Sequence, residues 1–317
     1  MELIRGSLNL GERHQGCVVT IGTFDGIHLG HQALLQRLRD HAARLGRPAM
    51  MLTFEPMPRE YLMPSCPPAR LTSWRERWHI LCGAGLDYMC VLRFGESLRS
   101  LSGEGFAGLL ARELHSRLVL VGHDFRFGRH GEATASVLAG AGAALGFDVD
   151  VVPPVLLDGV RVSSSGVREA LAKSDFALAH TWLGRAYSMT GRVVRGNQLG
   201  RELGYPTANL RTGRRRVPVA GIFAVLVHGV SGTPMPGVAS LGTRPTVAGS
   251  GEMLLEAHLF DYSGELYGRE IEVQFVAKLR DEERFASLEA LVQQMNADAA
   301  TARRILGAGQ PQAQRQE

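Results

Sequence analysis

The chain carries two glycine-rich segments that lie far apart and in stretches of different character. The first, Gly22–His31, directly follows an apolar run. The second, Gly200–Asn209, lies within a stretch rich in β-forming residues. Glycine-rich turns let the backbone approach a phosphate group closely, and a helix that begins there favours an anion. The two segments therefore predict two phosphate-handling sites on one polypeptide.

Length and composition favour a globular protein of two domains. The chain has 317 residues, of which 45% are hydrophobic and 21% charged, and a single core rarely grows to this size. No apolar run approaches the roughly 20 residues that cross a bilayer. The N-terminus lacks the basic start and long apolar stretch of a secretory signal. We expect a cytoplasmic protein with no membrane partner.

Cysteine spacing and charge exclude several other classes. Cys17, Cys66, Cys82 and Cys90 form no Cys-x-x-Cys pair, which predicts reduced thiols and no zinc site. The net charge is only +4. The one basic run, 214–216, has no interleaved aromatic residues, so a solvated loop is favoured over a nucleic-acid contact.

The first half of the chain alternates short apolar runs with helical patterns. Such alternation predicts a parallel sheet with helices on both faces, the α/β Rossmann-like class. The predicted strands are 17–21, 49–54, 88–92, 118–121 and 149–152. The predicted helices are 27–45, 75–84, 104–114 and 134–145, followed by closing helices at 165–171 and 176–183.

The character of the sequence changes near Gly184. Short strands separated by Gly, Pro and Ser predict a small antiparallel β-barrel. These strands are 187–194, 222–228, 236–241, 253–260 and 270–279. Apolar residues at helical spacing from Leu288 to Ile305 predict a C-terminal helix that packs on the barrel. The expected domains are 1–183 and 184–306, with a flexible tail at 307–317.

The first glycine-rich segment joins a strand to a helix. His28 and His31 lie three residues apart in the first helical turn, so they share a face and can stabilise charge that develops on a phosphate. Taken alone, they could also be metal ligands or surface histidines. Arg161–Arg168 adds serines suited to a helix N-cap, with Arg168 one turn later as a phosphate clamp. A simple capped helix is the alternative.

These segments, with Thr53–Pro56 and Gly122–Gly128, resemble the FMN adenylyltransferase module of prokaryotic bifunctional FAD synthetases. The resemblance implies transfer of AMP from ATP to FMN, with release of pyrophosphate. It implies that His28, His31 and Arg168 are catalytic, that Gly22, Thr23, Phe24, Asp25, Gly26, Gly30, Arg161, Ser163 and Ser164 bind nucleotide, and that Phe54, Asp124, Phe125 and Phe127 line the flavin and adenine sites. Met57 and Ser165 depart from the usual His and Thr of that family.

The second segment places Thr207 and Asn209 two residues apart in extended chain, so their side chains project to one side. A hydroxyl and an amide oxygen suit Mg²⁺, which keeps waters and substrate phosphates in its shell. A glycine-rich hairpin without chemistry is the alternative. Glu256 lies in an apolar strand on the face of His258 and Phe260, where either catalysis or a salt bridge would explain a carboxylate.

The second half resembles riboflavin kinase over nearly all of residues 184–306. The matching segments are Gly191–Leu210, Gly237–Thr246, Glu256–Asp261, Leu266–Gly268 and Leu279–Phe285. The resemblance implies a six-stranded barrel that phosphorylates riboflavin from ATP and Mg²⁺. It implies Thr207 and Asn209 as metal ligands, Glu256 as general base, Arg280 near the flavin, and Gly191, Gly196, Gly200 and Gly204 at the nucleotide. Ser240 replaces the asparagine usual in that family.

Together the two halves predict an enzyme that makes FMN and then FAD, with riboflavin, FMN and ATP as its small-molecule partners. We expect a monomer or a weak, transient oligomer. Three alternatives are an enzyme with one vestigial site, a nucleotidyltransferase with another acceptor such as a pantetheine phosphate, and a flavin-binding regulator without turnover.

Overall fold

The computed structural model describes residues 1–196, 204–244 and 252–308, and the chain folds into two compact units. The first unit combines Met1–Pro68 with Arg77–Ser164. The second combines Ala69–Glu76 with Ser165–Glu317. The segment Ala69–Glu76, called the strap below, therefore belongs with the C-terminal half although it lies early in the sequence. Among the described residues, no helix is both long and apolar enough to cross a membrane.

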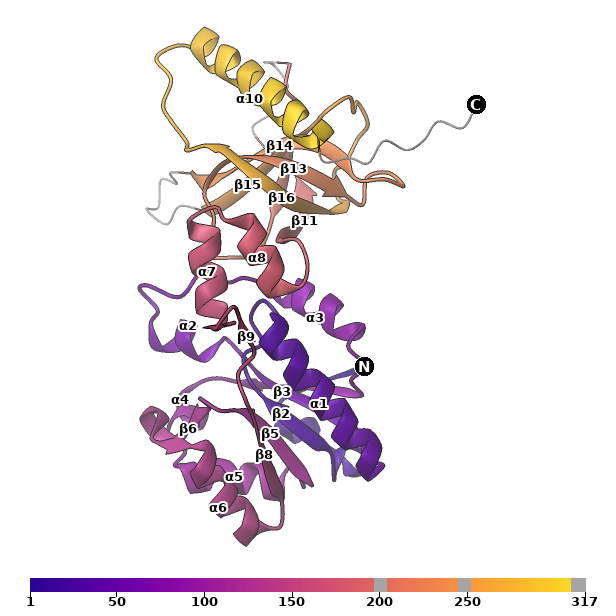
Figure 1. Cartoon of the computed structure of the whole chain (residues 1–317), viewed down its shortest axis with the longest axis vertical. Helices are drawn as coiled ribbons and strands as arrows, with labels where there is room; N and C mark the ends of the chain where they lie inside the picture. Colours follow the sequence, from indigo (N-terminus) through magenta and orange to yellow (C-terminus); the bar gives the residue numbers. More distant parts are fainter. Residues whose placement is uncertain (197–203, 245–251, 309–317) are drawn as a thin grey trace. The chain divides into compact units, whose positions relative to one another are not determined.

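The first unit is built on a six-stranded parallel sheet of order β1-β4-β3-β2-β5-β8 (Figure 1). Its strands are β1 Glu2–Arg5, β2 Val18–Ile21, β3 Ala49–Glu55, β4 Tyr88–Arg93, β5 Leu118–Gly122 and β8 Asp148–Val152. The central strands β2 and β3 are apolar and almost entirely buried, as strands covered on both faces must be. The sequence predicted all of these strands except β1, a four-residue edge strand of which only Ile4 is buried.

Helices cover both faces of this sheet. They are α1 Leu29–Leu45, α3 Trp74–Cys82, α5 Gly103–Arg112 and α6 Ala135–Leu145. α1 packs on β2, β3 and β5, whereas Phe106 and Leu110 of α5 and Leu138 of α6 join the core on the opposite face. The shorter elements are the helices α2 Pro58–Leu62 and α4 Glu96–Arg99, with the two-residue strand pairs β6 Arg126–Phe127 with β7 Ala133–Thr134, and β9 Leu156–Leu157 with β10 Val160–Arg161.

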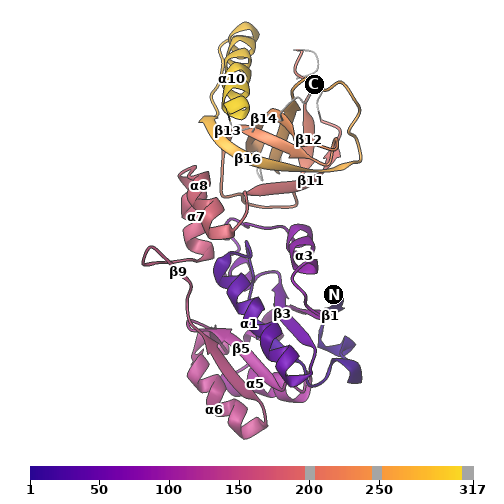
Figure 2. The same ribbon diagram turned by 45° about the vertical axis from the view of Figure 1, so that its right-hand side comes forward.

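The second unit contains a closed antiparallel barrel of order β11-β12-β15-β14-β13-β16. The strands are β11 Ser188–Val194, β12 Ala208–Arg211, β13 Gly221–His228, β14 Met235–Arg244, β15 Glu252–Leu259 and β16 Glu270–Arg280. Alternate residues such as Phe223, Val225 and Leu255 are wholly buried. The helices are α7 Ser164–Ala172, α8 Phe176–Leu183 and α10 Leu288–Ala308. Figure 2 shows α10 against the outside of the barrel, where it contacts β13, β14 and β16, as the apolar spacing predicts.

The strap is fixed to the barrel unit by a buried ion pair between Glu76 and Arg214. The Glu76 carboxylate also accepts hydrogen bonds from the backbone N–H of Thr190 at 2.6 Å and of Ser73 at 2.7 Å. Arg214 donates in addition to backbone carbonyls of the strap, and its side chain has no solvent exposure. The prediction that 214–216 form a solvated loop is therefore wrong for Arg214. The hydrogen-bond acceptors of Arg214 lie in the strap, far away in the sequence. The residues around Arg214 therefore give no indication that its side chain is buried.

Replacement of Arg214 by methionine should leave the Glu76 carboxylate buried without its counter-charge. Breaking a buried pair from one side typically costs about 3–5 kcal/mol, so we expect a loss of this size in the free energy of unfolding of the barrel unit. Urea unfolding followed by circular dichroism measures it. Arg215→Met, at the exposed neighbouring position, is the control and should change the free energy by less than about 0.5 kcal/mol. Equal stabilities of the two variants would contradict the role of the pair.

Candidate active sites

The turn between β2 and α1 has an unusual backbone. Phe24 and Ile27 have φ angles of 50° and 44°, in the left-handed region that side-chain-bearing residues rarely adopt. Both side chains are buried, with 0% and 2% exposure. Backbone strain of this kind persists only where the surroundings hold it, and it gathers at functional sites. The turn that the sequence assigned to phosphate is thus a strained, anchored segment.

Two side chains from elsewhere in the first unit hold the carbonyl groups of this turn. Arg77 Nη1 donates to the Thr23 carbonyl at 2.6 Å, and Ser164 Oγ donates to the Asp25 carbonyl at 2.9 Å. Arg77 is completely buried and also pairs with Glu55 at 3.1 Å. These bonds fix the turn at the N-terminal end of α1, where the helix dipole favours an anion. Sequence reasoning missed Arg77, because nothing local distinguishes it from other helical arginines.

His28 and His31 lie on one face of the first turn of α1, as their spacing predicts. His28 is the N-cap residue, and its Nδ1 accepts a hydrogen bond from the His31 backbone N–H at 3.4 Å. The two rings are stacked, with centroids 3.8 Å apart and planes inclined by 19°. Glycine at position 30 leaves room for this packing, since a Cβ there would lie 3.1 Å from the His28 ring and the ring would have to shift by a few tenths of an ångström. The pair forms a compact imidazole surface at the start of the helix.

The His31 ring is held in its uncharged form. Burial lowers the pKa of His31 well below 6.5, and the nearby His28 and Arg77 lower it further. Its Nδ1 is inaccessible to solvent and has no hydrogen-bond partner among the described residues. A neutral imidazole is suited to hydrogen-bond a substrate rather than to form an ion pair.

The depressed pKa of His31 predicts a pH dependence of stability. The unfolded chain takes up the His31 proton near pH 6.5, before the folded protein does, so the contribution of this group is full above about pH 6.5 and is lost as the pH falls towards the folded pKa. His31→Gln should flatten the decline in unfolding free energy between pH 7 and 5.5 by up to about 1.4 kcal/mol per pH unit. Urea unfolding at several pH values measures the slope. His79→Gln, at an exposed position, is the control. If the unfolding free energy of His31→Gln fell with pH as steeply as that of the unsubstituted protein, the result would contradict the burial of His31 in its neutral form.

The aromatic residues predicted to line the flavin and adenine sites lie largely in the core. Phe54 and Phe127 are only 8% and 7% exposed and belong to the main hydrophobic cluster. Phe125 is partly buried and stacks on Phe127 with centroids 5.4 Å apart. These rings therefore have a packing role whether or not an edge of Phe125 contacts a ligand.

Two charged residues predicted for different ligands contact each other. Arg161 Nη2 lies 2.5 Å from the Asp124 carboxylate. Burial alone would raise the pKa of Asp124, but the hydrogen bond and charge of Arg161 hold it below its usual value.

Arg168 belongs to the second unit, and its Nε donates to the Ala69 carbonyl of the strap at 2.6 Å. Its role beside the histidines stays a prediction.

On the barrel, the register of three strands brings the kinase candidates into one row. Asn209 of β12 is directly opposite Glu256 of β15, and Glu256 is opposite Ser240 of β14. Directly opposed residues project from the same face of a sheet with Cβ atoms about 4.5–5.5 Å apart. The neighbouring Leu255 and Ala257 are fully buried, whereas Glu256 is only partly buried. The predicted metal ligand and the predicted base are thus side-chain neighbours.

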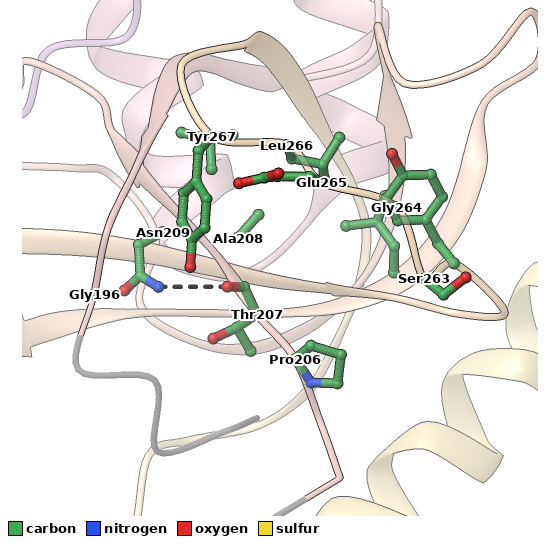
Figure 3. Close-up of a pocket in the computed structure, with 13 residues that line it drawn as sticks. Gly196, Pro206, Thr207, Ala208, Asn209, Ser263, Gly264, Glu265, Leu266 and Tyr267 are labelled. Carbon is green, nitrogen blue, oxygen red and sulfur yellow. Dashed lines mark hydrogen bonds between the residues drawn. The ribbon is translucent and has the colours of Figure 1, made fainter. Parts of the chain in front are cut away.

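A pocket of about 560 Å³ adjoins this row (Figure 3). It is lined by Val193, Gly196, Pro206, Thr207, Ala208, Asn209, Leu259, Tyr262, Ser263, Gly264, Glu265, Leu266 and Tyr267. Figure 3 shows the side-chain amide of Asn209 beside Thr207, with a hydrogen bond from Asn209 Nδ2 to the Thr207 carbonyl at 3.5 Å. The Asn209 Oδ1 is buried and has no hydrogen-bond partner among the described residues.

The donor set fits Mg²⁺. The orphaned Oδ1 of Asn209 and the hydroxyl of Thr207 are neutral, hard oxygen ligands, and such a site leaves coordination positions for water and phosphate. Within the described ranges, no group of three or more His, Cys, Asp or Glu side chains could hold a metal ion. Gly196 makes room for this amide, since a Cβ on Gly196 would overlap it.

The other glycines assigned to the second nucleotide differ in their surroundings. Gly191 lies within β11, where a Cβ would be 2.9 Å from the Arg211 carbonyl, so strand packing accounts for it. Gly204 has a φ angle of +82° in the turn before Thr207. Gly200 falls outside the described residues. The pocket wall 262–265 was not predicted, and its only signal was the neighbouring Leu266–Gly268 match.

A parallel-sheet unit with a histidine pair at a helix N-terminus, and a barrel unit with a polar row beside a pocket, define a two-site enzyme that handles nucleotides. The family model for FAD synthetase matches residues 10–166, and the model for riboflavin kinase matches residues 183–306. The chain belongs to the bifunctional riboflavin kinase/FMN adenylyltransferase family. The two matched segments correspond to the two activities of that family, adenylyl transfer in the N-terminal part and riboflavin phosphorylation in the C-terminal part.

Individual relatives support the assignment over almost the whole length. The enzyme of Pseudomonas fluorescens is 48% identical over 306 residues, which cover 96% of this chain and 98% of the relative. The enzyme of Escherichia coli K12 is 45% identical over 313 residues, which cover 98% of this chain and 100% of the relative. The crystal structure of a macrolide-efflux protein from Streptococcus pneumoniae has a TM-score of 0.80 at 29% identity, and the match covers 96% of this chain and 99% of that one.

Proposed function

We propose that residues 184–306 convert riboflavin to FMN and that residues 1–183 adenylylate this FMN to FAD, each reaction consuming ATP. The observation that carries the first half of the proposal is the direct opposition of Asn209 and Glu256 on β12 and β15. This opposition supports a role for Asn209 as a metal ligand next to Glu256 as a carboxylate base. We expect both reactions in the cytoplasm, where ATP is available, and a protein that acts as a monomer or in weak, transient oligomers.

In the kinase reaction, Glu256 accepts the proton of the riboflavin 5′-hydroxyl while the hydroxyl oxygen attacks the terminal phosphorus of ATP, the bond from that phosphorus to the β–γ bridging oxygen breaks, and ADP leaves. Thr207 and Asn209 would hold Mg²⁺, which would neutralise charge on the ATP phosphates. The pocket wall of 262–267 encloses the nucleotide next to these ligands. Arg280 is the last residue of β16, next to the loop that follows this strand, and it lies near the flavin.

In the adenylyl transfer, a phosphate oxygen of FMN attacks the α-phosphorus of ATP, and pyrophosphate leaves. His28 and His31 hydrogen-bond the phosphates at the N-terminus of α1, and the strained turn at 22–27 supplies backbone N–H groups. Arg168 contributes positive charge to the leaving pyrophosphate. The supporting observation is the stacked, partly desolvated histidine pair on an anchored turn.

Removal of Glu256 should separate the two activities. Glu256→Ala should lower kinase turnover by about 10²–10⁴-fold, the usual weight of a general base, and leave conversion of FMN to FAD unchanged. Chromatography of flavins after incubation with ATP and Mg²⁺ measures both steps. Glu272→Ala, at an exposed position of β16, is the matched control. An unchanged kinase step would remove Glu256 as the base.

Removal of His28 should have the converse effect. His28→Ala should still form FMN from riboflavin but make no measurable FAD, because a contact that strengthens in the transition state is lost. The same flavin chromatography provides the measurement, and His180→Ala, at an exposed position of α8, is the control. FAD formed at the normal rate by His28→Ala would exclude His28 from the mechanism.

The unsubstituted protein distinguishes the alternatives. Sequential formation of FMN and then FAD supports two working sites. Accumulation of FMN alone indicates a vestigial adenylyltransferase site or another acceptor. Tight binding of flavin without consumption of ATP indicates a regulator.

A further inference from the structure

A second carboxylate lies beside Glu256 on the barrel surface. Gly242 of β14 is two residues along the strand from Ser240, the residue opposite Glu256, and is itself opposite Leu254. Residues two apart in a strand project from the same face, so the surface at Gly242 is diagonal to Glu256 and within reach of a long side chain.

Glu282 occupies the space above Gly242. A Cβ on Gly242 would overlap both carboxylate oxygens of Glu282, and these are the nearest atoms that it would meet. The φ angle of Gly242 lies outside the left-handed region, so a residue with a side chain could adopt the same backbone conformation. The approach of the Glu282 carboxylate therefore explains why a glycine fits here.

The residues on either side of Glu282 are held by Arg280. Its Nη1 donates to the Asp281 carbonyl at 3.0 Å and lies 3.3 Å from the Glu283 carboxylate. Arg280 is in turn fixed by Asp298 of α10, with its Nε 3.0 and 3.1 Å from the two carboxylate oxygens and its Nη2 at 2.8 Å. The Asp298 side chain is only 8% exposed. The loop that carries Glu282 is thus tied to the helix that packs on the barrel.

The position of Glu282 is electrostatically unfavourable. Partial burial and the negative charge of Glu256 both raise the pKa of Glu282, and Arg280 lowers it only in part. Among the described residues, the Glu282 carboxylate has no hydrogen-bond or ion-pair partner. A carboxylate brought towards another carboxylate, exposed and unpaired, is available to a neutral, hydroxyl-bearing ligand.

We propose that Glu282 is a substrate-contacting residue of the kinase site, which accepts hydrogen bonds from the hydroxyl groups of the riboflavin polyol chain while Glu256 takes the proton of the reacting hydroxyl. The inference rests on the proposed role of Glu256. The two carboxylates then have different functions. Glu282 binds the polyol chain of riboflavin, and Glu256 activates the hydroxyl group at the end of that polyol chain. Arg280 and Asp298 act as positioning residues for this loop.

The first test separates binding from turnover. Glu282→Ala should raise the KM for riboflavin about 10- to 100-fold, the usual weight of a charged hydrogen-bond acceptor, with kcat within about threefold and the KM for ATP unchanged. Asp281→Asn is the matched control, because this neighbouring carboxylate is 86% exposed and pairs only with Lys278 among the described residues. An unchanged KM for ATP and a kcat within threefold report that the barrel unit of each variant is folded.

The second test uses the contact between Gly242 and Glu282. Gly242→Ala should displace the Glu282 carboxylate and raise the KM for riboflavin as Glu282→Ala does. In a chain that already has Glu282→Ala, the alanine at 242 should add little, so the two effects should not multiply.

An unchanged KM for riboflavin in Glu282→Ala overturns the inference, as does a fall in kcat alone, which would mark a role in proton transfer instead. Independent, multiplying effects of Gly242→Ala and Glu282→Ala also overturn it. Loss of kinase turnover in Glu256→Ala with no effect of Glu282→Ala removes only this inference. Full turnover in Glu256→Ala removes the proposed base, and the KM of Glu282→Ala then still reports whether residue 282 contacts the substrate.

Discussion

Closure of six strands into a barrel is the constraint on which the C-terminal site depends. In a closed barrel every strand has two hydrogen-bonded neighbours, so its register cannot slip without exposing the side chains that fill the interior. That register places Asn209, Glu256 and Ser240 in adjacent positions on three strands. Backbone hydrogen bonds of the barrel thereby hold the predicted metal ligand beside the predicted base. Ser240 is the third member of this row.

The candidate residues of the N-terminal unit are held in place by side-chain contacts rather than by strand register. There a turn with two left-handed, apolar residues is held by the burial of Phe24 and Ile27 and by donors to its carbonyl groups from Arg77 and Ser164. In both units the residues predicted to act on phosphate lie next to buried neighbours, and among the described residues His31 Nδ1 and Asn209 Oδ1 have no hydrogen-bond partner.

Much of this organisation could be predicted from the sequence, because it follows from local patterns. The alternation of apolar runs predicted the parallel sheet, the spacing of short strands predicted the barrel, and the two glycine-rich segments predicted one candidate site in each half of the chain. The features that escaped prediction depend on contacts between distant residues. The edge strand Glu2–Arg5 has too little apolar pattern of its own, the buried state of Arg214 depends on the strap, and the pairing of Asp124 with Arg161 joins residues predicted for different ligands.

The strap also has a consequence for the order in which the protein can fold during synthesis. Glu76 precedes Arg214 by 138 residues, and the boundary between the two units falls immediately after Glu76. At the usual speed of a ribosome, the strap waits on the order of ten seconds before its partner is made. During that time Arg77 can already join the first unit, while its neighbour Glu76 remains in water. The N-terminal unit must therefore fold without a short segment that lies within its own stretch of sequence, and the barrel unit completes a buried ion pair with a residue translated before any of its own strands.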